Sequence, residues 1–214
     1  MTDTDIIILG VNGNCIDTAE TIELLQRQGQ PLRVRGFLDD DETLHGQAVA
    51  GYPVLGPIAI ASEFPAASFV CGIGSPRSFG RKPTLVAAAA VPAERWATIV
   101  HPAVAVSPSA RLGHGTVLLA HCSVGANARI GNHVMVLQNT VISHDAVVGD
   151  YSAVATGVCV SGLVEIGANC YLGSHATIRE RLRVGPRTLV GMGAVVTADI
   201  PCDAVVMGNP ARPR

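Results

Sequence analysis

From Val106 to Val196, every sixth residue of the chain is valine, isoleucine or leucine. This series has sixteen members: Val106, Leu112, Leu118, Val124, Ile130, Val136, Ile142, Val148, Val154, Val160, Ile166, Leu172, Ile178, Val184, Val190 and Val196. A small residue usually stands two places before the aliphatic one, and glycine often follows it. A period of six is typical of hexapeptide repeats, in which each hexad forms one flat face and a turn, so that three hexads close a triangular coil. The pattern therefore predicts a parallel β-helix over residues 101–214, and its left-handedness is a property of this class of repeat.

Residues 1–100 have a different pattern, in which short apolar segments alternate with helical ones. The segments "DIIIL", "LRVRGFL" and "SFVCGIG" predict three strands. Apolar residues at helical spacing predict a helix over 17–28, and a second helix is expected to begin at Ser75-Pro76 and run to Ala90. Strands that alternate with helices indicate a small Rossmann-like parallel sheet. We therefore expect an α/β domain over 1–100, followed by the β-helix domain.

Composition supports this division and restricts the class of protein. Hydrophobic residues make up 48% of the chain but aromatic residues only 4%, which suits a narrow prism without room for large rings. Fifteen basic and seventeen acidic side chains form no concentrated basic face, so we expect no nucleic-acid partner. Several arginines gather between residues 179 and 214, where they fit either a solvated surface or a dock for a phosphate-bearing ligand.

The location of the protein can also be predicted from the sequence. The N-terminal segment "MTDTDIIILG" has acidic residues and a four-residue apolar run, unlike a signal peptide, and no apolar run is long enough to span a membrane. Six cysteines occur without a CxxC pair and without Cys/His metal spacing. We expect a cytoplasmic protein that uses neither a membrane nor a metal.

The segment "TVISHDAVVG" carries the strongest candidate for chemistry. His144 stands two residues after the inward Ile142, so the repeat places it at a corner, where packing does not require it. Positions eighteen apart are neighbours in adjacent coils, about 4.8 Å apart, and those of His144 are Ala126 and Gly162. A histidine beside an unobstructed backbone N–H can act as the general base of an acyl transfer.

Carbonic anhydrases of the gamma class also use hexapeptide helices, but they need three histidines around zinc. The HxxxxH spacing is absent after His144, because position 149 is glycine. His121 and His175 lie on a different edge of the predicted coil, three coils apart. The sequence thus disfavours a zinc site.

Several segments of the chain resemble a family of bacterial acyltransferases that contains nucleotide-aminosugar N-acetyltransferases and sialic-acid O-acetyltransferases. They are "FLDDD", "GYPVLG", "CGIGSPRSFGRK", "IVHPAVAVSPSARLG", "ISHDAVVGDYSAVATGVCVSGLVEIGANCYLGSHATI" and "VVTADIPCDAVVMGNPARP". The hexads alone are unspecific, whereas the join between this N-terminal domain and the "SHD…SG" segment is specific to the family.

This resemblance implies a homotrimer that takes acetyl groups from acetyl-CoA, with active sites between neighbouring β-helices. His144 matches the family's general base, and Asp145 matches the acidic residue that orients it. Gly162 matches the glycine whose N–H approaches the acetyl carbonyl. Three further positions match the CoA channel: Ser174, Gly191 and Ala153, the last standing where some relatives have histidine. Direct attack on the thioester suffices, without an acetylated enzyme.

In the N-terminal half, the resemblance implies a binding site for a nucleotide-linked sugar. Asn12, Gly13 and Asn14 match the loop that faces the pyrophosphate, with Asn14 replacing the histidine of many relatives. Asp39 and Asp40 match acidic residues that face the nucleotide base. Taken alone, "GVNGNC" after a strand is more often an ordinary turn, and it lacks the GxGxxG pattern of nicotinamide sites.

The predicted function is acetyl-CoA-dependent N-acetylation of a nucleotide-linked amino-deoxysugar, with a 4-amino group as the expected acceptor, in surface-glycan assembly. Two alternatives stay open at this point. One is O-acetylation of a sugar of the sialic-acid type, in which the same base acts on a hydroxyl. The other is a trimer that binds a sugar nucleotide without catalysis.

Overall fold

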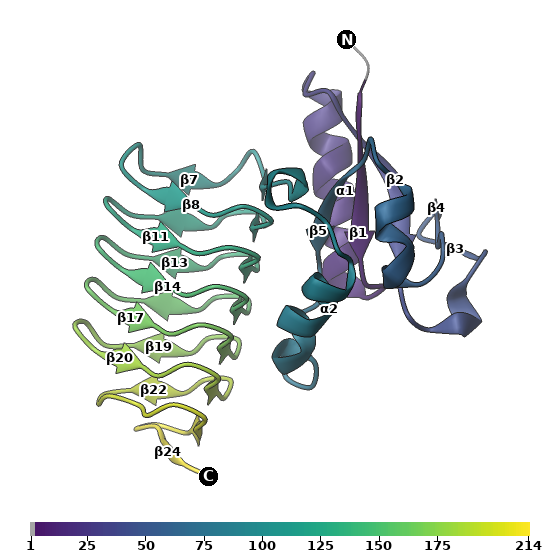
Figure 1. Ribbon diagram of the computed structural model, residues 1–214. Coiled ribbons are helices and arrows are strands. Elements are labelled where there is room, and N and C mark those ends of the chain that lie inside the picture. Colours follow the sequence, from purple (N-terminus) through teal and green to yellow (C-terminus); the bar gives the residue numbers. More distant parts are fainter. Residues whose placement is uncertain (1–2) are drawn as a thin grey trace.

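The computed structural model describes residues 3–214 and contains an α/β domain that packs on one face of a parallel β-helix (Figure 1). The N-terminal sheet has the order β2-β1-β5, and all three strands are parallel. Its elements are β1 (Thr4–Leu9), α1 (Gly13–Arg27), β2 (Leu32–Leu38), β5 (Ser68–Cys71) and α2 (Lys82–Ala88), with a small antiparallel pair β3 (Ala48–Val49) and β4 (Tyr52–Pro53). The predicted α/β class is confirmed.

Four short 3-10 helices join these elements: η1 (Glu42–Leu44), η2 (Ile58–Glu63), η3 (Phe79–Arg81) and η4 (Ala93–Arg95). The prediction that the second helix begins at Ser75-Pro76 is wrong. The 3-10 helix η3 comes first, and α2 begins at Lys82. The hydroxyls of Ser75 and Ser78 bond each other at 2.7 Å and hold a turn there. The proline tolerated in the first turn of α2 is Pro83.

The β-helix has three faces, each a stack of short parallel strands. The face under the N-terminal domain, here the covered face, is formed by β6 (Ile99–Val100), β9 (Val117–Leu118), β12 (Met135–Val136), β15 (Ala153–Val154), β18 (Tyr171–Leu172), β21 (Leu189–Val190) and β23 (Val205–Met207), and β24 (Arg212–Pro213) adds to it antiparallel. The second face is formed by β7 (Ala105–Val106), β10 (Ser123–Val124), β13 (Val141–Ile142), β16 (Cys159–Val160), β19 (Thr177–Ile178) and β22 (Val195–Val196). The third face is formed by β8 (Arg111–Leu112), β11 (Arg129–Ile130), β14 (Val147–Val148), β17 (Glu165–Ile166) and β20 (Arg183–Val184).

In β7 to β22, the second residue of each strand belongs to the six-residue series and points into the prism, and the first residue points out. The second face therefore presents small, uncharged residues and is called the neutral face: Ala105, Ser123, Val141, Cys159, Thr177 and Val195. The third face presents arginines and a glutamate and is called the charged face. The left-handed β-helix predicted from the repeat is confirmed.

The corners of the prism repeat as regularly as its faces. A residue with positive φ occurs at every sixth position from Gly115 to Gly193, where the chain turns from one face to the next. The glycines that follow the inward aliphatic residues are needed for a different reason, the close approach of the next coil. A Cβ on Gly125 would lie 2.6 Å from the backbone nitrogen of His144 in the next coil, so only glycine lets successive coils stack there.

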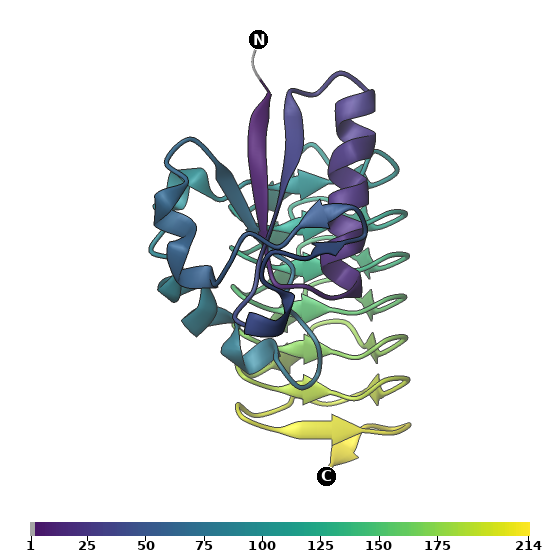
Figure 2. The ribbon, with the colours of Figure 1, turned by 90° about the vertical axis from the view of Figure 1, so that its right-hand side faces the viewer.

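The two domains share an apolar core. Alternate residues of β1 point to opposite sides of the small sheet, so Ile6 and Ile8 pack toward α1. The same cluster contains Val117 and Met135 from the covered face, both almost completely buried. Figure 2 shows the N-terminal domain lying in front of the stacked coils. This packing fixes which sides of the prism are left open. None of the helices in the described residues is long and apolar enough to cross a membrane.

Candidate active site

His144 and Asp145 lie at the corner between the neutral and charged faces, here the His144 corner. Asp145 occupies the positive-φ position of this corner, with φ 57°. The His144 side chain is 62% exposed, so packing of the core does not require it. Its Nδ1 lies 2.8 Å from Oδ2 of Asp145. The corner geometry predicted from the repeat is confirmed, and the next residue in the chain orients the imidazole.

The carboxylate of Asp145 is anchored on both oxygens. Its Oδ1 accepts a hydrogen bond of 3.1 Å from Nδ2 of Asn127, which holds the same position one coil earlier. Hydrogen bonds from His144 and then from Asn127 lower the pKa of Asp145, and the nearby charge of Arg129 adds to this. An ionised carboxylate only accepts hydrogen bonds, so Nδ1 of His144 is the donor and Nε2 keeps its lone pair. This is the tautomer that a general base requires.

Gly162 lies against the other side of the same ring. A Cβ built on Gly162 would lie 2.6 Å from both Nε2 and Cε1 of His144, so any larger residue would displace the imidazole. In residues 3–214, the N–H of Gly162 donates no hydrogen bond within the chain. The free lone pair of the histidine and a free backbone donor are thus neighbours, as the spacing of eighteen predicts.

A groove of about 560 Å³ begins beside Asp145 and extends toward the earlier coils. It is lined by Pro108, Ser109, Ala110, Arg111, Asn127, Arg129 and Asp145. The sequence prediction did not include the two arginines. They are the outward residues of β8 and β11, and the hexad register places both on the side of the prism that Asp145 borders.

A second cavity, of about 390 Å³, lies at the carboxyl ends of β1 and β2 in the N-terminal domain. It is lined by Asn12, Asp39, Asp40, Asp41, Ile58, Ile73, Ser78, Arg81 and Leu85. Three of the five residues predicted to face a nucleotide therefore meet at one cavity. The basic residue among its charged lining side chains is Arg81, which lies within the segment "SPRSFGRK" and had no role predicted from the sequence.

Part of the predicted chemistry in this cavity is used to build the loops. The side chain of Asn12 caps α1 by accepting from the N–H groups of Asn14 and Cys15. Asp39 accepts 2.7 Å and 2.9 Å hydrogen bonds from the N–H groups of Val11 and Asp41. Asn12, the N-cap of α1, lines the cavity, so the positive end of the helix dipole borders it and favours an anion there, although two N–H groups of the first turn are already bonded to Asn12.

Two other residues of the loop differ in what surrounds them. A Cβ on Gly13 would meet nothing within 4 Å, and its φ is not positive, so no contact within the chain requires glycine at this position. Asn14 is half-buried, and its backbone carbonyl accepts from the Thr18 hydroxyl. Asp40 accepts a 3.0 Å hydrogen bond from the N–H of Ile58, which shapes the cavity wall.

The residues predicted to line a CoA channel do not meet Gly162 within one chain. Ser174 stands at the corner between the covered and neutral faces, and Gly191 follows β21, where a Cβ would lie 2.9 Å from that of Met207. Ala153 is 2% exposed beneath the N-terminal domain, 3.0 Å from the position of a Cβ on Gly74. These residues belong to other sides of the prism.

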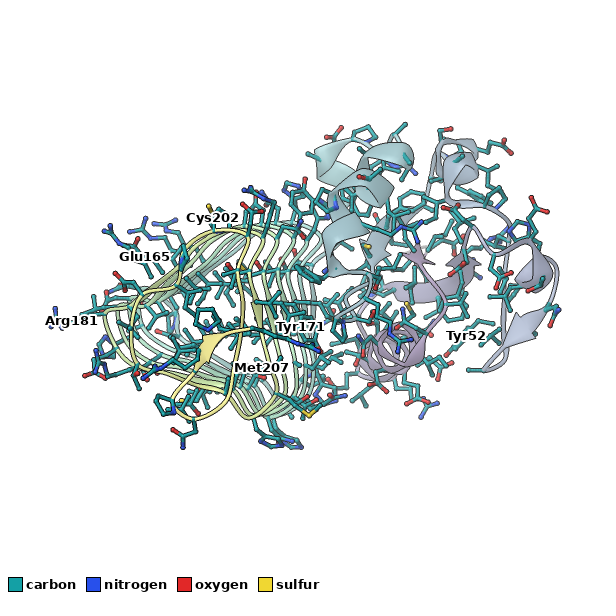
Figure 3. All side chains as sticks on the ribbon, turned by 90° about the horizontal axis from the view of Figure 1, so that it is seen from below. Tyr52, Glu165, Tyr171, Arg181, Cys202 and Met207 are labelled. Carbon is teal, nitrogen blue, oxygen red and sulfur yellow. The ribbon has the colours of Figure 1, made fainter. Side chains whose placement is uncertain are left out.

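The His144 corner is also remote from the N-terminal domain of its own chain. Arg181, which occupies the position of Asp145 two coils later, lies at the corner of the prism farthest from that domain, whereas Tyr171 lies beside the domain (Figure 3). One chain therefore presents the histidine and the N-terminal cavity on different sides. In residues 3–214, no group of three or more His, Cys, Asp or Glu side chains is placed to hold a metal ion.

Comparison with known proteins gives matches over the whole chain and over short segments. No protein-family model matches. The acetyltransferase domain of PglB from Neisseria gonorrhoeae, solved with acetyl coenzyme A, is 27% identical with a TM-score of 0.86, over 99% of this chain and 100% of that one. A variant of GDP-perosamine N-acetyltransferase from Caulobacter crescentus, solved with CoA and GDP-perosamine, is 26% identical with a TM-score of 0.86, over 98% and 96% of the two chains.

Curated relatives match only short segments. Galactoside O-acetyltransferase of Escherichia coli is 39% identical over 49 residues, 23% of this chain and 24% of its own length. The chain spans about a quarter or less of the curated relatives it matches. Together with the matches over the whole fold, these similarities confirm the predicted resemblance to the hexapeptide-repeat sugar acyltransferases, and with it the predicted class of acyltransferase.

Proposed function

We propose that this hexapeptide-repeat acyltransferase transfers the acetyl group of acetyl-CoA to the amino group of a nucleotide-linked amino-deoxysugar. The observation that carries the proposal is the His144 corner. There, Nε2 of His144 keeps its lone pair because Nδ1 donates to Asp145, and Gly162 offers a free N–H next to it. Similarity over nearly the whole chain to an acetyltransferase domain solved with acetyl-CoA, and to a GDP-perosamine N-acetyltransferase solved with CoA and GDP-perosamine, supports both substrates.

The proposed reaction is a direct displacement. The lone pair of the sugar amine forms a bond to the thioester carbonyl carbon, and Nε2 of His144 takes the proton that the amine loses. The N–H of Gly162 donates to the carbonyl oxygen as negative charge develops on it. When the C–S bond breaks, the imidazolium returns its proton to the departing thiolate, so the products are an N-acetyl sugar and CoA. Asp145 stabilises the imidazolium between these two transfers.

The cavity of the N-terminal domain is proposed to hold the nucleotide. Its position at the carboxyl ends of parallel strands, beside a helix N-terminus, is where α/β sheets bind phosphates. Gly13, the exposed residue after the cavity-lining Asn12, would meet nothing within 4 Å of an added Cβ, which leaves room for a pyrophosphate to approach the backbone. Asp39 and Asp40 would face the base, and Arg81 supplies positive charge at the same cavity.

The active site is proposed to form between two subunits of a homotrimer. Of the three faces of the prism, the covered face is occupied by the N-terminal domain and the charged face carries arginines, which leaves the neutral face for a partner. Cyclic packing on the neutral face brings the His144 corner of one subunit toward the Ser174 corner of the next. Ser174 and Gly191 would then line a CoA channel with Gly162, although they are far from it in one chain.

Ala153 and Asn14 need separate treatment in this proposal. Ala153 is buried against the N-terminal domain, so its contribution to the channel would be to leave space rather than to contact CoA. Asn14 would face the sugar nucleotide with an amide where many relatives have histidine. The 4-amino position of the acceptor and the role in surface-glycan assembly are proposed from the resemblance.

O-acetylation of a sugar is the alternative that a specific observation supports, since galactoside O-acetyltransferase matches part of the chain. That match covers 23% of the chain, whereas the GDP-perosamine N-acetyltransferase matches 98% of it. A hydroxyl depends on a base more steeply than an amine does, because an amine is nucleophilic once neutral. N-acetylation is therefore the function we propose.

The experiment is a thiol-release assay with acetyl-CoA across UDP-, GDP- and dTDP-linked 4-aminosugars, in parallel with matched sugars that carry a 4-hydroxyl. We expect release with an amino sugar, and a loss of at least about a hundredfold in kcat for His144→Ala. The matched control is His114→Ala, a half-buried histidine at the corner between the charged and covered faces, away from the proposed interface, which should retain full activity. Equal turnover by wild type and His144→Ala would rule out the base assigned here.

A further inference from the structure

Arg111 and Arg129 form a pair of like charges beside the His144 corner. They are the outward residues of β8 and β11, in direct register across the two strands, and both are exposed. Strand spacing places their backbones about 4.8 Å apart. Both line the groove of about 560 Å³ that Asp145 borders. The pair and the proposed base thus share one concave surface.

Within residues 3–214, neither of these guanidinium groups has a carboxylate partner within 4.0 Å. The other arginine at the same position of the charged face, Arg183, has one, because its Nε lies 3.2 Å from Glu165. Asp145 is the acidic residue in the groove, and both of its oxygens are already used by His144 and Asn127. The position that follows the pair on this face is Val147, which is uncharged.

Like charges directly opposite each other on neighbouring strands destabilise a sheet. Packing gives no reason for the pair, since both side chains point away from the prism. The groove also offers a neutral hydrogen-bonding group, the Ser109 hydroxyl. It accepts a 3.0 Å bond from the N–H of Asn127 and lies 3.2 Å from the Ser107 hydroxyl, and its own proton is free for a ligand when Ser107 is the donor of that pair. A groove with two unpaired guanidinium groups and a hydroxyl suits a ligand with two adjacent negative charges.

We propose that Arg111 and Arg129 bind the diphosphate group of a substrate and so hold that substrate at His144. This rests on the proposed function, in which the acetyl donor and the acceptor each carry a diphosphate. A guanidinium group binds phosphate oxygens bidentately, and two of them stacked along the prism can each take one phosphate. Arg111 and Arg129 are therefore positioning residues, which act on the reaction through the substrate they hold.

The test compares Arg111→Gln, Arg129→Gln and the double variant with Arg183→Gln, a matched control on the same face whose arginine has an acidic partner. Binding of inorganic pyrophosphate, acetyl-CoA, UDP, GDP and dTDP is measured by calorimetry at two salt concentrations. Each single change should weaken binding of pyrophosphate roughly tenfold, as expected for the loss of one charge-assisted interaction. The double variant should bind more weakly still, with less dependence on salt, and Arg183→Gln should bind as wild type does.

The substrate probes identify which diphosphate is bound. Weaker binding of acetyl-CoA alone assigns the pair to the donor. Weaker binding of a nucleoside diphosphate alone assigns it to the acceptor, whose diphosphate the pair would then hold together with the Gly13 loop of the neighbouring subunit. Either result supports the proposal, provided that thermal unfolding shows the variants to be folded. Since the two arginines repel each other in the wild-type protein, we expect the Tm of the variants to be unchanged or higher.

Two results would overturn the proposal. One is a double variant that binds all five probes as tightly as wild type, and the other is an equal loss in Arg183→Gln, which would indicate general attraction of anions. Failure of the proposed function gives a different outcome, in which arginine-dependent binding of pyrophosphate persists but acetyl-CoA is not consumed with any amino sugar. Consumption of acetyl-CoA with unchanged kinetics in the double variant would leave the function standing and remove the diphosphate site.

Discussion

At the scale of single residues, the geometry of the candidate base depends on the absence of a side chain at Gly162. The ring of His144 fills the space where a side chain at that position would lie, 2.6 Å from both Nε2 and Cε1. Its other nitrogen is fixed by Asp145. The imidazole is thus held between the carboxylate of Asp145 in its own coil and the backbone of Gly162 in the next coil. Asp145 is one residue after His144 in the sequence, and Gly162 is eighteen residues after it.

Gly162→Ala tests this arrangement directly. Its φ is not positive, so alanine is tolerated by the backbone, and the new methyl group has to push the imidazole aside. We expect kcat to fall by about tenfold to a hundredfold, because small displacements of a catalytic group are costly. KM for the amino sugar should change far less, and the protein should stay folded by circular dichroism.

The control for this change is Gly80→Ala, since a Cβ on Gly80 meets nothing within 4 Å and its φ is not positive either. It should leave kcat unaltered. A Gly162→Ala enzyme with normal kcat would show that the position of His144 next to Gly162 is not needed for the reaction.

At the scale of elements, the sequence predicts regular features better than single ones. The hexad register correctly places Ile142 inside the prism and His144 at a corner, because a repeat of period six leaves no freedom in the direction of a side chain. The second helix was misplaced at Ser75-Pro76, because two serine hydroxyls bond each other there and delay α2 to Lys82. A local side-chain contact of this kind has no periodic pattern that would show it in advance.

The cavities were less predictable for the same reason. Asn12, Asp39 and Asp40 could be named from a resemblance, but Arg81 could not, since its presence at that cavity depends on how η3 follows the turn at Ser75. Arg111 and Arg129 were missed although the register places them, because nothing in the sequence shows which arginines lack an acidic partner. That requires the fold.

An ion pair links the last coils of the β-helix, and its dependence on pH gives a prediction about acid stability. Arg187, in the corner after β20, binds both oxygens of Asp203, which precedes β23, at 2.5 Å and 2.6 Å. The hydrogen bond from Arg187 lowers the pKa of Asp203. A carboxyl group with a lowered folded-state pKa stabilises the fold above the ordinary value of about 3.9, and this stabilisation is lost as the pH falls through the lowered value.

Asp203→Asn should therefore lower the Tm slightly at pH 7, and by the same amount down to about pH 4. Below that, the two Tm values should converge, and they should coincide once the wild-type carboxyl is protonated. Thermal unfolding from pH 7 to about pH 2.5 measures this. Glu180→Gln, which removes an exposed carboxylate without an ion pair in residues 3–214, should give no such pH-dependent difference. A constant Tm difference at every pH would contradict the assignment of the effect to the charge of Asp203.

At the scale of the whole molecule, the central fact is that one chain holds its histidine and its N-terminal cavity on different sides of the prism, because His144 lies at the corner opposite the covered face. The N-terminal domain is fixed to the covered face by a shared apolar core, so it does not reach the His144 corner by rotating about a loose linker. The proposed reaction joins the two sites, and it would therefore require a second copy of the chain. The neutral face, with its small outward side chains, is the surface on which that copy would pack.

Mixed oligomers test this requirement without any knowledge of the interface. His144→Ala removes the base, and Arg81→Glu places a negative charge in the proposed nucleotide cavity, so each variant alone should be nearly inactive. If each site takes its histidine from one subunit and its cavity from the next, equal random mixing after reversible dissociation restores about one site in four, or about a quarter of wild-type activity. Sites built within one chain would give no recovery. Mass measurement after mixing should give about three times the 22.1 kDa of the chain. A mixture that forms trimers but stays inactive would place the complete site in a single chain and contradict the assembly, because the distance between His144 and Arg81 would then have to close within one molecule.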